Sequence, residues 1–281
     1  MQTVTDAAAL RAAIRGWRTA GKTVGFVPTM GNLHAGHHSL LKLARARADR
    51  VVASVFVNPT QFGPGEDFER YPRTLAQDQA GLAEAGCDLL FAPDVATMYP
   101  FGPAASVSIH VPVITDTLDG AHRPGHFDGV ATVVAKLFSL VSPDLALFGQ
   151  KDFQQLKVIE RMVRDLSLPL KVMSAPTLRE EDGLAMSSRN QYLSPQERIR
   201  APMIHATLQQ IRDLFRQGHA WQALETAAKA RLERAGFVPD YVAIRRAEDL
   251  GEPGAEEREG LVALVAARLG TTRLIDNLPF D

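Results

Sequence analysis

The chain has 281 residues, of which 46% are hydrophobic and 22% are charged, and its formal net charge is -1 at pH 7. These values exclude a disordered or fibrous protein, and the near-neutral charge argues against nucleic acid as the main partner, because nucleic-acid binding normally requires a basic face. Cys87 is the only cysteine, which excludes an internal disulfide and a multi-cysteine metal site. Because no apolar run reaches the roughly 18 residues of a membrane span and no signal-peptide pattern is present, we expect a cytoplasmic protein without membrane contact.

Helix and strand patterns alternate over the first 176 residues. Apolar residues recur at helical spacing from Leu10 to Trp17, and Gly21 follows as a stop signal. Short apolar runs typical of buried strands cover residues 23–27, 51–57, 88–92, 144–148 and 169–174. Further helices are predicted over residues 37–48 and 130–140 and around residues 158–163. The alternation predicts an α/β fold with a Rossmann-like parallel sheet, covered by helices on both faces, in a domain of residues 1–176.

The pattern changes after residue 176. Ser194 and Glu197 form a capping box at a helix start, and an apolar stripe from Ile204 to Phe215 continues the helical pattern. A second helix is predicted over residues 221–235, and strands are predicted over 241–244, 261–266 and 273–275. We therefore expect a smaller α+β domain over residues 177–281. Its charged stretch at 252–259 is typical of a solvated loop.

Polar residues follow three of the predicted strands. His34 and His37 lie after the first strand, Asn58 and Gln61 lie after the second, and Gly149–Gln155 follows the run that ends at Phe148. In parallel sheets ligands bind beyond the carboxyl ends of the strands, so we expect these loops to open onto one crevice. A helix start presents unpaired N–H groups to an anion, and Gly36 permits close backbone approach. The pattern favours a nucleotide phosphate as the ligand.

Each of these groups also has a simpler interpretation. His34, His37 and His38 could form a metal cluster, but no carboxylate supports them and the spacing is not a familiar ligand pattern. Lys151 and Asp152 could form a surface ion pair, and Ser187–Arg189 could form a turn instead of a phosphate clamp. Arg123 and His126, in another polar loop, could be structural or part of a site. Cys87 is best explained as a structural residue at a strand entry.

The ordered motifs resemble those of the pantoate:beta-alanine ligase family, which belongs to the nucleotidyltransferase superfamily with the H-x-G-H signature. The similarity extends over nearly the whole chain. The motifs that carry it are Pro28-Thr29-Met30-Gly31, His34-Ala35-Gly36-His37, Phe56–Phe62, Tyr71–Thr74, Arg123–Phe127, Phe148–Gln155, Ser187–Asn190 and Leu274–Asn277. Two positions depart from many relatives, since Gln150 stands where Glu is usual and Met186 stands where Leu is usual. Neither departure removes a charge that the chemistry requires.

The resemblance implies an ATP-dependent ligase of pantothenate and coenzyme A biosynthesis. Pantoate would attack the α-phosphorus of Mg-ATP to give a pantoyl adenylate and pyrophosphate, and beta-alanine would then displace AMP. The implied cofactors are ATP, as a substrate, and Mg²⁺, whose ligands are not assigned. The implied partners are these small molecules and a second copy of the chain in a homodimer, with no nucleic acid. Residues 1–176 would bind ATP and pantoate, and residues 177–281 would close as a lid.

The resemblance also assigns the site residues. The catalytic residues would be His34, His37, Lys151 and Arg189, with His37 as the general acid for pyrophosphate. ATP would contact Met30, Gly31, Asn32, Leu33, His34, Ala35, Gly36, His37, Gly149, Gln150, Lys151, Asp152, Leu178, Met186, Ser187, Ser188 and Arg189. Pantoate and beta-alanine would contact Pro28, Thr29, Asn58, Gln61 and Gln155. From the H-x-G-H pattern alone, nucleotidyl transfer to another acceptor, a fragment like an aminoacyl-tRNA synthetase and a non-catalytic nucleotide sensor stay open.

Overall fold

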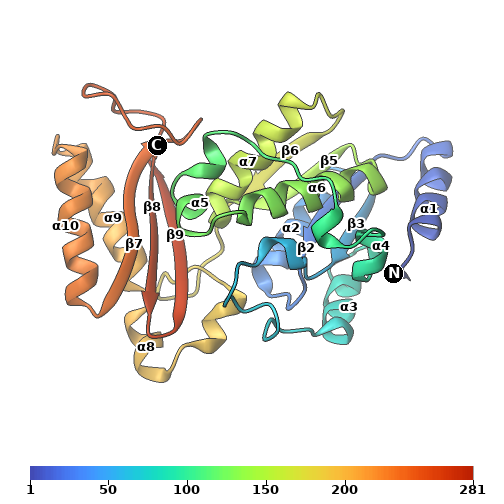
Figure 1. The fold of residues 1–281 in the computed structure, drawn as a ribbon, viewed down its shortest axis with the longest axis horizontal. Helices are drawn as coiled ribbons and strands as arrows, with labels where there is room; N and C mark the ends of the chain where they lie inside the picture. The colour runs from blue at the N-terminus through green and yellow to red at the C-terminus, as the bar shows by residue number, and fades with distance from the viewer. Residues whose placement is uncertain (281) are drawn as a thin grey trace. The chain divides into compact units, whose positions relative to one another are not determined.

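The computed structural model describes residues 1–280, and their contacts divide the chain into two compact units. The first unit comprises Met1–Gln150 and Gln155–Pro176, and the second comprises Lys151–Gln154 and the chain from Thr177 onward. The short segment Lys151–Gln154 therefore groups with the second unit, whereas the sequence analysis placed it in the first domain. Each unit is described separately below (Figure 1).

The first unit is built on a six-stranded sheet with the strand order β1-β4-β3-β2-β5-β6. Every pair of neighbouring strands is parallel. The strands are β1 (Gln2–Val4), β2 (Val24–Thr29), β3 (Arg50–Val55), β4 (Leu89–Phe91), β5 (Leu145–Gly149) and β6 (Lys171–Ala175). The predicted parallel sheet is confirmed, and it brings the carboxyl ends of β2, β3 and β5 to one edge.

Helices pack on both faces of this sheet. The helices of this part of the chain are α1 (Ala7–Thr19), α2 (Ala35–Arg45), α3 (Leu75–Glu84), α4 (Val95–Met98), α5 (Asp119–His122), α6 (His126–Val141) and α7 (Phe153–Asp165). Leu41 of α2 and Leu82 of α3 belong to one buried cluster with Val27 of β2. The preceding residue of β2, Phe26, meets Phe138 of α6 edge to face at 6.3 Å. Because successive strand residues point to opposite faces, α2 and α3 cover one face and α6 covers the other.

Several elements differ from the sequence prediction. Strand β2 continues through Pro28 instead of ending before it. The hydrogen-bonded pairing of β2 with β5 ends at Phe26. Pro28 is therefore tolerated, because β5 no longer pairs with the strand at the position where the proline lacks an N–H. Helix α2 begins at Ala35 instead of His37, because His34 serves as its N-cap. Strand β1 escaped prediction because its three residues carry no apolar alternation.

The second unit is a three-stranded antiparallel sheet with helices packed against it. Its elements are η5 (Ser188–Tyr192), α8 (Pro195–Arg200), α9 (Met203–Arg216), α10 (Trp221–Arg234), β7 (Phe237–Arg246), β8 (Leu261–Leu269) and β9 (Thr272–Phe280). The predicted stripe of α9, from Ile204 to Phe215, lies in one buried cluster with residues of α10 and all three strands. Ser194 and Glu197 form the predicted capping box of α8. The smaller α+β fold is therefore confirmed.

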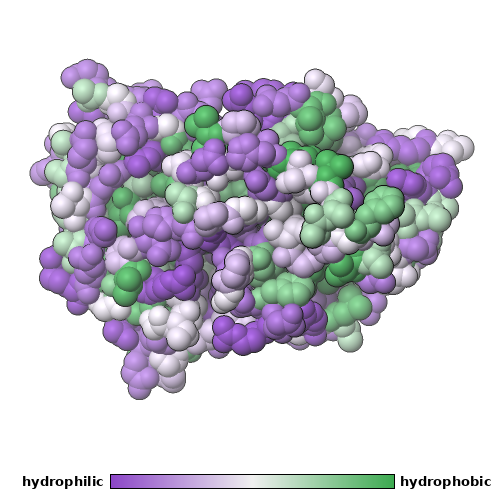
Figure 2. Space-filling view, viewed as in Figure 1, coloured by the Kyte–Doolittle hydropathy of each residue, from purple (hydrophilic) through white to green (hydrophobic). Residues whose placement is uncertain are grey.

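The surface is mixed in polarity. Figure 2 shows hydrophilic residues over most of the visible face, interrupted by separate hydrophobic patches. Within residues 1–280, none of the helices combines the length and apolar character that a bilayer crossing requires. Cys87 is buried as a free thiol, and burial raises its pKa to about 11. The predicted structural role of this cysteine fits a thiol that stays protonated.

Candidate active site

Two histidines cap the first turn of α2 at the carboxyl end of β2. His34 is the N-cap, and its Nδ1 accepts a hydrogen bond from Gly36 N at 3.1 Å. The Nδ1 of His37, at position N3, accepts from His34 N at 3.3 Å, which completes a reciprocal capping box. The two rings lie 4.2 Å apart between centroids. The H-x-G-H motif therefore forms a capping box in which imidazoles replace the usual hydroxyl and carboxyl groups.

The capping box determines which ring nitrogen carries a proton. A nitrogen that accepts from a backbone N–H cannot itself be protonated, so the neutral rings of His34 and His37 carry their protons on Nε2. The donor group of each ring is then Nε2–H. This tautomer suits donation to an anion without a charge on the imidazole.

Gly36 is required by the cap itself. A Cβ at Gly36 would lie 2.8 Å from Cε1 and 3.0 Å from Nδ1 of His34, so any side chain would displace the capping ring. The expectation that this helix start offers unpaired N–H groups to a ligand was wrong for Gly36 and His37. Their N–H groups donate to the side chain and to the carbonyl of His34. These two amides are therefore used by the cap itself.

The segment after β3 is a fixed polar cluster. Asn58 is only 1% exposed and is the N-cap of the short 3-10 helix η1 (Pro59–Gln61). Its Oδ1 accepts from the hydroxyl of Tyr99 at 2.6 Å, and its Nδ2 donates to Oε1 of Gln61 at 3.2 Å. The Nε2 of Gln61 in turn donates to Sδ of Met30 at 3.2 Å. This chain brings Met30, Asn58 and Gln61 together, as the prediction of a shared crevice requires for the loops after β2 and β3.

Arg123 and His126 hold this cluster from α5 and α6. Arg123 makes a bidentate ion pair with Glu66, with both contacts at 2.6 Å, and its Nη1 donates to Nε2 of His126 at 2.9 Å. The Nδ1–H of His126 donates to the carbonyl of Gln61 at 2.7 Å. Burial, followed by the charge of Arg123, lowers the pKa of His126 to about 4. A neutral His126 therefore links the ion pair to Gln61, and both residues act here as supports of the cluster.

This burial makes stability depend on pH. The pKa of His126 is about 4 in the folded protein against an ordinary 6.5, so the unfolded chain takes up the proton first as pH falls. The folded state therefore loses stability between pH 6.5 and pH 4. We expect the wild type to lose about 1 to 2 kcal/mol more than a His126→Gln variant between about pH 7 and pH 5 in urea unfolding. Equal losses in the two proteins would contradict this role.

The remaining predicted residues of the first unit occupy the same edge of the sheet. Pro28 and Thr29 end β2, and the hydroxyl of Thr29 donates to Ser54 O of β3 at 2.7 Å. Gly149 ends β5 and Gln150 follows it, while the partly buried Gln155 lies in the first turn of α7. Gly31, Asn32, Leu33 and Ala35 belong to the segment that connects β2 to α2. The sequence predicts Gln155 at the end of a loop after β5, but the residue lies in helix α7, which already begins at Phe153.

The predicted residues of the second unit form two groups. Lys151 and Asp152 form the ion pair that the simpler interpretation allowed, with Nζ 3.5 Å from Oδ1. The Nδ2 of Asn277 donates to the carbonyl of Lys151 at 2.9 Å, which ties this segment to β9. Leu178 accepts from Met186 N at 3.0 Å, so these two residues lie side by side across a tight turn. Ser187 caps the 3-10 helix η5 by accepting from Arg189 N at 3.3 Å, and Ser188 lies between them.

Asp276 organises this turn, a role that the sequence analysis did not assign. Its buried carboxylate, 4% exposed, forms a bidentate pair with Arg179 at 2.6 and 3.0 Å. Arg179 also donates to Gly183 O at 3.1 Å, which closes the turn that leads to Ser187. Asp276 belongs to the Leu274–Asn277 motif, but its partner Arg179 lies 97 residues away in the sequence, so the motif alone does not indicate the ion pair. Arg179 and Asp276 therefore set the position of the segment that carries the two serines and Arg189.

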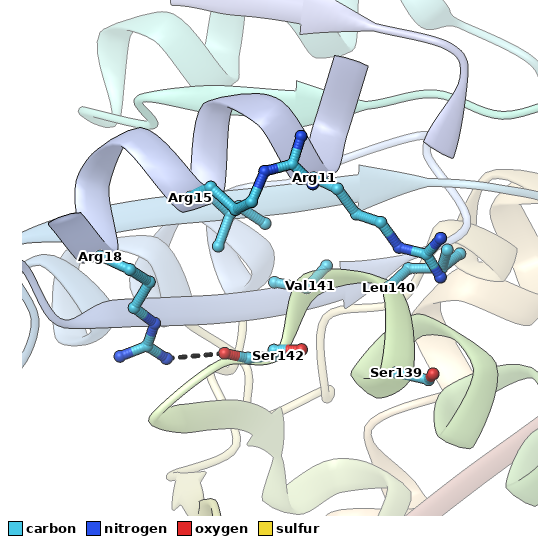
Figure 3. A pocket seen from close by; sticks show the side chains of 8 residues that line it. Arg11, Arg15, Arg18, Ser139, Leu140, Val141 and Ser142 are labelled. Carbon is cyan, nitrogen blue, oxygen red and sulfur yellow. Dashed lines mark hydrogen bonds between the residues drawn. The ribbon is translucent and has the colours of Figure 1, made fainter. Parts of the chain in front are cut away.

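A cavity of about 240 Å³ lies elsewhere on the first unit, between α1 and the end of α6 (Figure 3). It is lined by Arg11, Ile14, Arg15, Arg18, Ser139, Leu140, Val141 and Ser142. Arg18 donates to Ser142 O and to Asp144, each at 2.7 Å. Cations favour a helix C-terminus, so Arg18 is explained as stabilising the end of α6. The cavity lies where the chain enters β5, at the opposite edge of the sheet from His34 and His37.

The described residues offer no ready-made metal cage. Residues 1–280 contain no group of three or more His, Cys, Asp or Glu side chains placed to hold a metal ion. His34 and His37 use their Nδ1 atoms for the helix cap, which occupies one potential ligand atom on each ring. Mg²⁺ prefers oxygen ligands and commonly takes most of them from substrate phosphates and water. We therefore assign no metal ligand to the protein.

Comparison with known proteins identifies the family. The family model described as pantoate-beta-alanine ligase matches residues 2–279. The chain belongs to the pantoate-beta-alanine ligase family. It is 58% identical to the pantothenate synthetase of Xanthomonas axonopodis pv. citri over 280 residues, which cover 100% of both chains. The pantothenate synthetase structure from Thermus thermophilus matches with a TM-score of 0.93 and 51% identity, covering 100% of this chain and 99% of that one.

A third relative was solved with ligands. The pantoate-beta-alanine ligase of Francisella tularensis, complexed with beta-gamma ATP and beta-alanine, matches with a TM-score of 0.82 and 32% identity. The match covers 99% of this chain and 97% of that chain. The family match extends over both units of the chain, and the predicted family resemblance is confirmed.

Proposed function

We propose that this protein ligates pantoate to beta-alanine with the consumption of ATP, giving pantothenate, AMP and pyrophosphate. The observation that carries the proposal is the family match over residues 2–279, supported by the reciprocal imidazole cap at His34 and His37. A carboxylate is a poor electrophile, so the acid must first be activated. A carboxylate oxygen of pantoate attacks the α-phosphorus of ATP and pyrophosphate leaves with the electrons of the broken P–O bond. The amine of beta-alanine then attacks the acyl carbon of pantoyl adenylate, and AMP leaves.

The imidazoles supply hydrogen-bond donors to the phosphates in this proposal. Phosphoryl transfer depends mainly on positioning and charge stabilisation, for which a protein nucleophile is not required. The cap fixes Nε2–H as the donor of each ring, and protonation of Nδ1 would oppose the N–H group that it accepts from. We therefore propose that His37 stabilises departing pyrophosphate by donating a hydrogen bond from a neutral ring. This replaces the expected proton transfer with hydrogen bonding.

The nucleotide loop and the second unit complete the ATP contacts. Met30–His37, Gly149 and Gln150 would contact the nucleotide from the first unit. Lys151 would neutralise phosphate charge, and Asp152 would accept from a ribose hydroxyl. Leu178 and Met186–Arg189 would contact ATP from the second unit, which would act as a lid. Arg189 suits this role because its planar guanidinium offers paired donors to a phosphate. Mg²⁺ enters as part of the Mg-ATP substrate, and no step is assigned to a protein-held metal.

Pantoate and beta-alanine would bind at the rigid amide cluster. The side chains of Asn58 and Gln61 bond to each other, Tyr99 donates to Asn58, and His126 donates to the backbone carbonyl of Gln61, so this segment has little freedom to move. Gln155, from α7, would hold the hydroxyl and carboxylate groups of pantoate. Pro28 and Thr29 would line the same region at the end of β2. Rigid amides favour one orientation of the small, polar pantoate and thereby bring its carboxylate to the α-phosphorus.

A paired assay tests the function. Pyrophosphate release should require pantoate and proceed without beta-alanine for one turnover, whereas AMP release should require beta-alanine as well. A nucleotide sensor would bind ATP without releasing pyrophosphate, and a nucleotidyltransferase for another acceptor would not respond to pantoate. Either of these results would overturn the proposal.

Substitution of His37 tests the imidazole role. Loss of a phosphate donor should lower the single-turnover rate of adenylate formation roughly 10² to 10³-fold in His37→Ala. His37→Gln keeps an acceptor at N3, so it should retain more of the helix cap while still losing most of the rate. His38→Ala is the matched control, because the ring of His38 faces Gly81 of α3 and should be dispensable for adenylation. A near-normal rate in His37→Ala would reject the assignment.

Substitution of Gln155 tests the division of substrates. Gln155→Ala should weaken pantoate binding by about tenfold or more, through the loss of hydrogen bonds to its polar groups, and should leave ATP binding nearly unchanged. Calorimetric titration of each substrate separates the two effects. Equal losses of affinity for pantoate and ATP would show that Gln155 supports the site as a whole.

The resemblance also implies a homodimer in the cytoplasm, and we retain both as proposals. Light scattering of the purified chain should give the mass of two copies at assay concentration. A monomeric mass with full activity would show that assembly is not required.

A further inference from the structure

The segment between β2 and α2 is held by a buried carboxylate from a distant helix. Asp78 lies in the first turn of α3 and is 2% exposed. Its Oδ2 accepts from Asn32 N at 3.0 Å, and its Oδ1 accepts from Leu33 N at 2.8 Å. The hydroxyl of Thr74 donates to Oδ2 at 3.1 Å and orients the group. A buried carboxylate is stable only when hydrogen bonds replace its water, and two of these are the backbone of the loop itself.

The backbone of this loop is in an unusual conformation. Gly31 and Asn32 have φ angles of 86° and 52°, so two successive residues are left-handed. For a residue other than glycine such a conformation is unfavourable and persists only where the surroundings enforce it. A Cβ at Gly31 would lie 2.9 Å from Oδ2 of Asp78 and 3.0 Å from Cγ1 of Val55. The glycine thus makes room for the carboxylate, and the carboxylate stabilises the turn.

The loop determines where the capping histidines stand. Leu33, whose N–H is held by Asp78, directly precedes His34, and the ring of His34 begins the capping box with His37. The other end of the loop is held by Thr29, whose hydroxyl accepts from Gly31 N at 3.2 Å. With β2 fixed in the sheet and α2 packed on it, Asp78 holds the backbone of the segment that connects the strand end to the first turn of α2.

We propose that Asp78 is a positioning residue for adenylation, which acts by holding the Gly31–Leu33 loop so that the imidazoles of His34 and His37 meet the phosphates of ATP. The inference rests on the proposed function for its catalytic part, but its binding part depends only on ATP recognition. Asp78 itself makes no contact with substrate in this scheme. Its role is to make the site ready before ATP arrives.

Three variants test the proposal at room temperature after circular dichroism has shown that each is folded. Asp78→Asn replaces one acceptor oxygen with a donor that opposes a loop N–H. It should weaken ATP binding and lower the single-turnover rate of adenylation, together by about 10 to 100-fold, because small displacements of reacting groups have effects of this size. Pantoate affinity should stay within about twofold, since Asn58, Gln61 and Gln155 are proposed to bind pantoate from other segments. Thr74→Val leaves the carboxylate in place without its orienting bond and should give a smaller loss of the same kind.

Asp88→Asn is the matched control. Asp88 is also a largely buried carboxylate, and it accepts from Val51 N at 2.8 Å and pairs with Arg45 and Arg50 at the start of β4. It lies at the other edge of the sheet, so its loss should lower the melting temperature without changing ATP affinity. A merely structural Asp78 would behave in the same way, with a lower melting temperature and unchanged ATP affinity and adenylation.

Gly31→Ala provides a second arm if Asp78→Asn does not fold. Because Gly31 is itself a proposed ATP contact, the result that supports Asp78 is the smaller loss in the Thr74→Val background. The added methyl group would displace the carboxylate, so the variant should lose ATP affinity in the same direction, and the loss should shrink in the Thr74→Val background. Calorimetry with Mg-ATP alone measures ATP binding without catalysis, and it therefore separates the positioning role of Asp78 from the proposed ligase function. Wild type that binds ATP but shows no pantoate-dependent pyrophosphate release would contradict only the proposed function. Normal ATP affinity and adenylation in folded Asp78→Asn, Thr74→Val and Gly31→Ala would overturn the role of Asp78.

Discussion

The reciprocal cap between His34 and His37 is the interaction on which the site depends. Each imidazole accepts a backbone N–H through Nδ1, which closes the start of α2 and leaves the protonated Nε2 at the outer end of each ring. One pair of contacts therefore completes a helix and fixes the tautomer of two potential phosphate donors. The cap also requires the glycine between the two histidines, because a side chain at Gly36 would collide with the ring of His34.

Around this cap, buried polar groups hold the short segments that carry the proposed site residues. Asp78 holds the loop before His34, the Glu66–Arg123–His126 chain holds Gln61, and Asp276 with Arg179 holds the turn before Ser187. Each of these networks contains a carboxylate and uses it to bind backbone N–H groups or an arginine. Such networks restrict the conformations available before substrate binds, which reduces the entropy lost when the substrates and reacting groups are aligned.

Much of the fold could be predicted from local patterns, whereas the supports of the site could not. The apolar runs that became β2, β3 and β5 and the stripe from Ile204 to Phe215 were evident because burial imposes a period on the residues themselves. Asp78 carries no such mark, since its contacts to the loop span 45 and 46 residues of sequence and appear only once α3 packs beside α2. The same holds for Asp276, whose motif was noticed but whose partner was not. The start of α2 was placed too late because histidine is an uncommon N-cap.

The central claim is that His34 and His37 are neutral rings, protonated at Nε2, that donate to the phosphates of ATP. Long-range ¹H–¹⁵N NMR of the histidine side chains measures this directly, because the shifts of the two ring nitrogens report both the tautomer and its hydrogen bonds. The account predicts the Nε2–H form for both rings in the free protein, and a change in both Nε2 signals when Mg-ATP is added. A proton on Nδ1 of either ring, or Nε2 signals that do not respond to ATP, would contradict it.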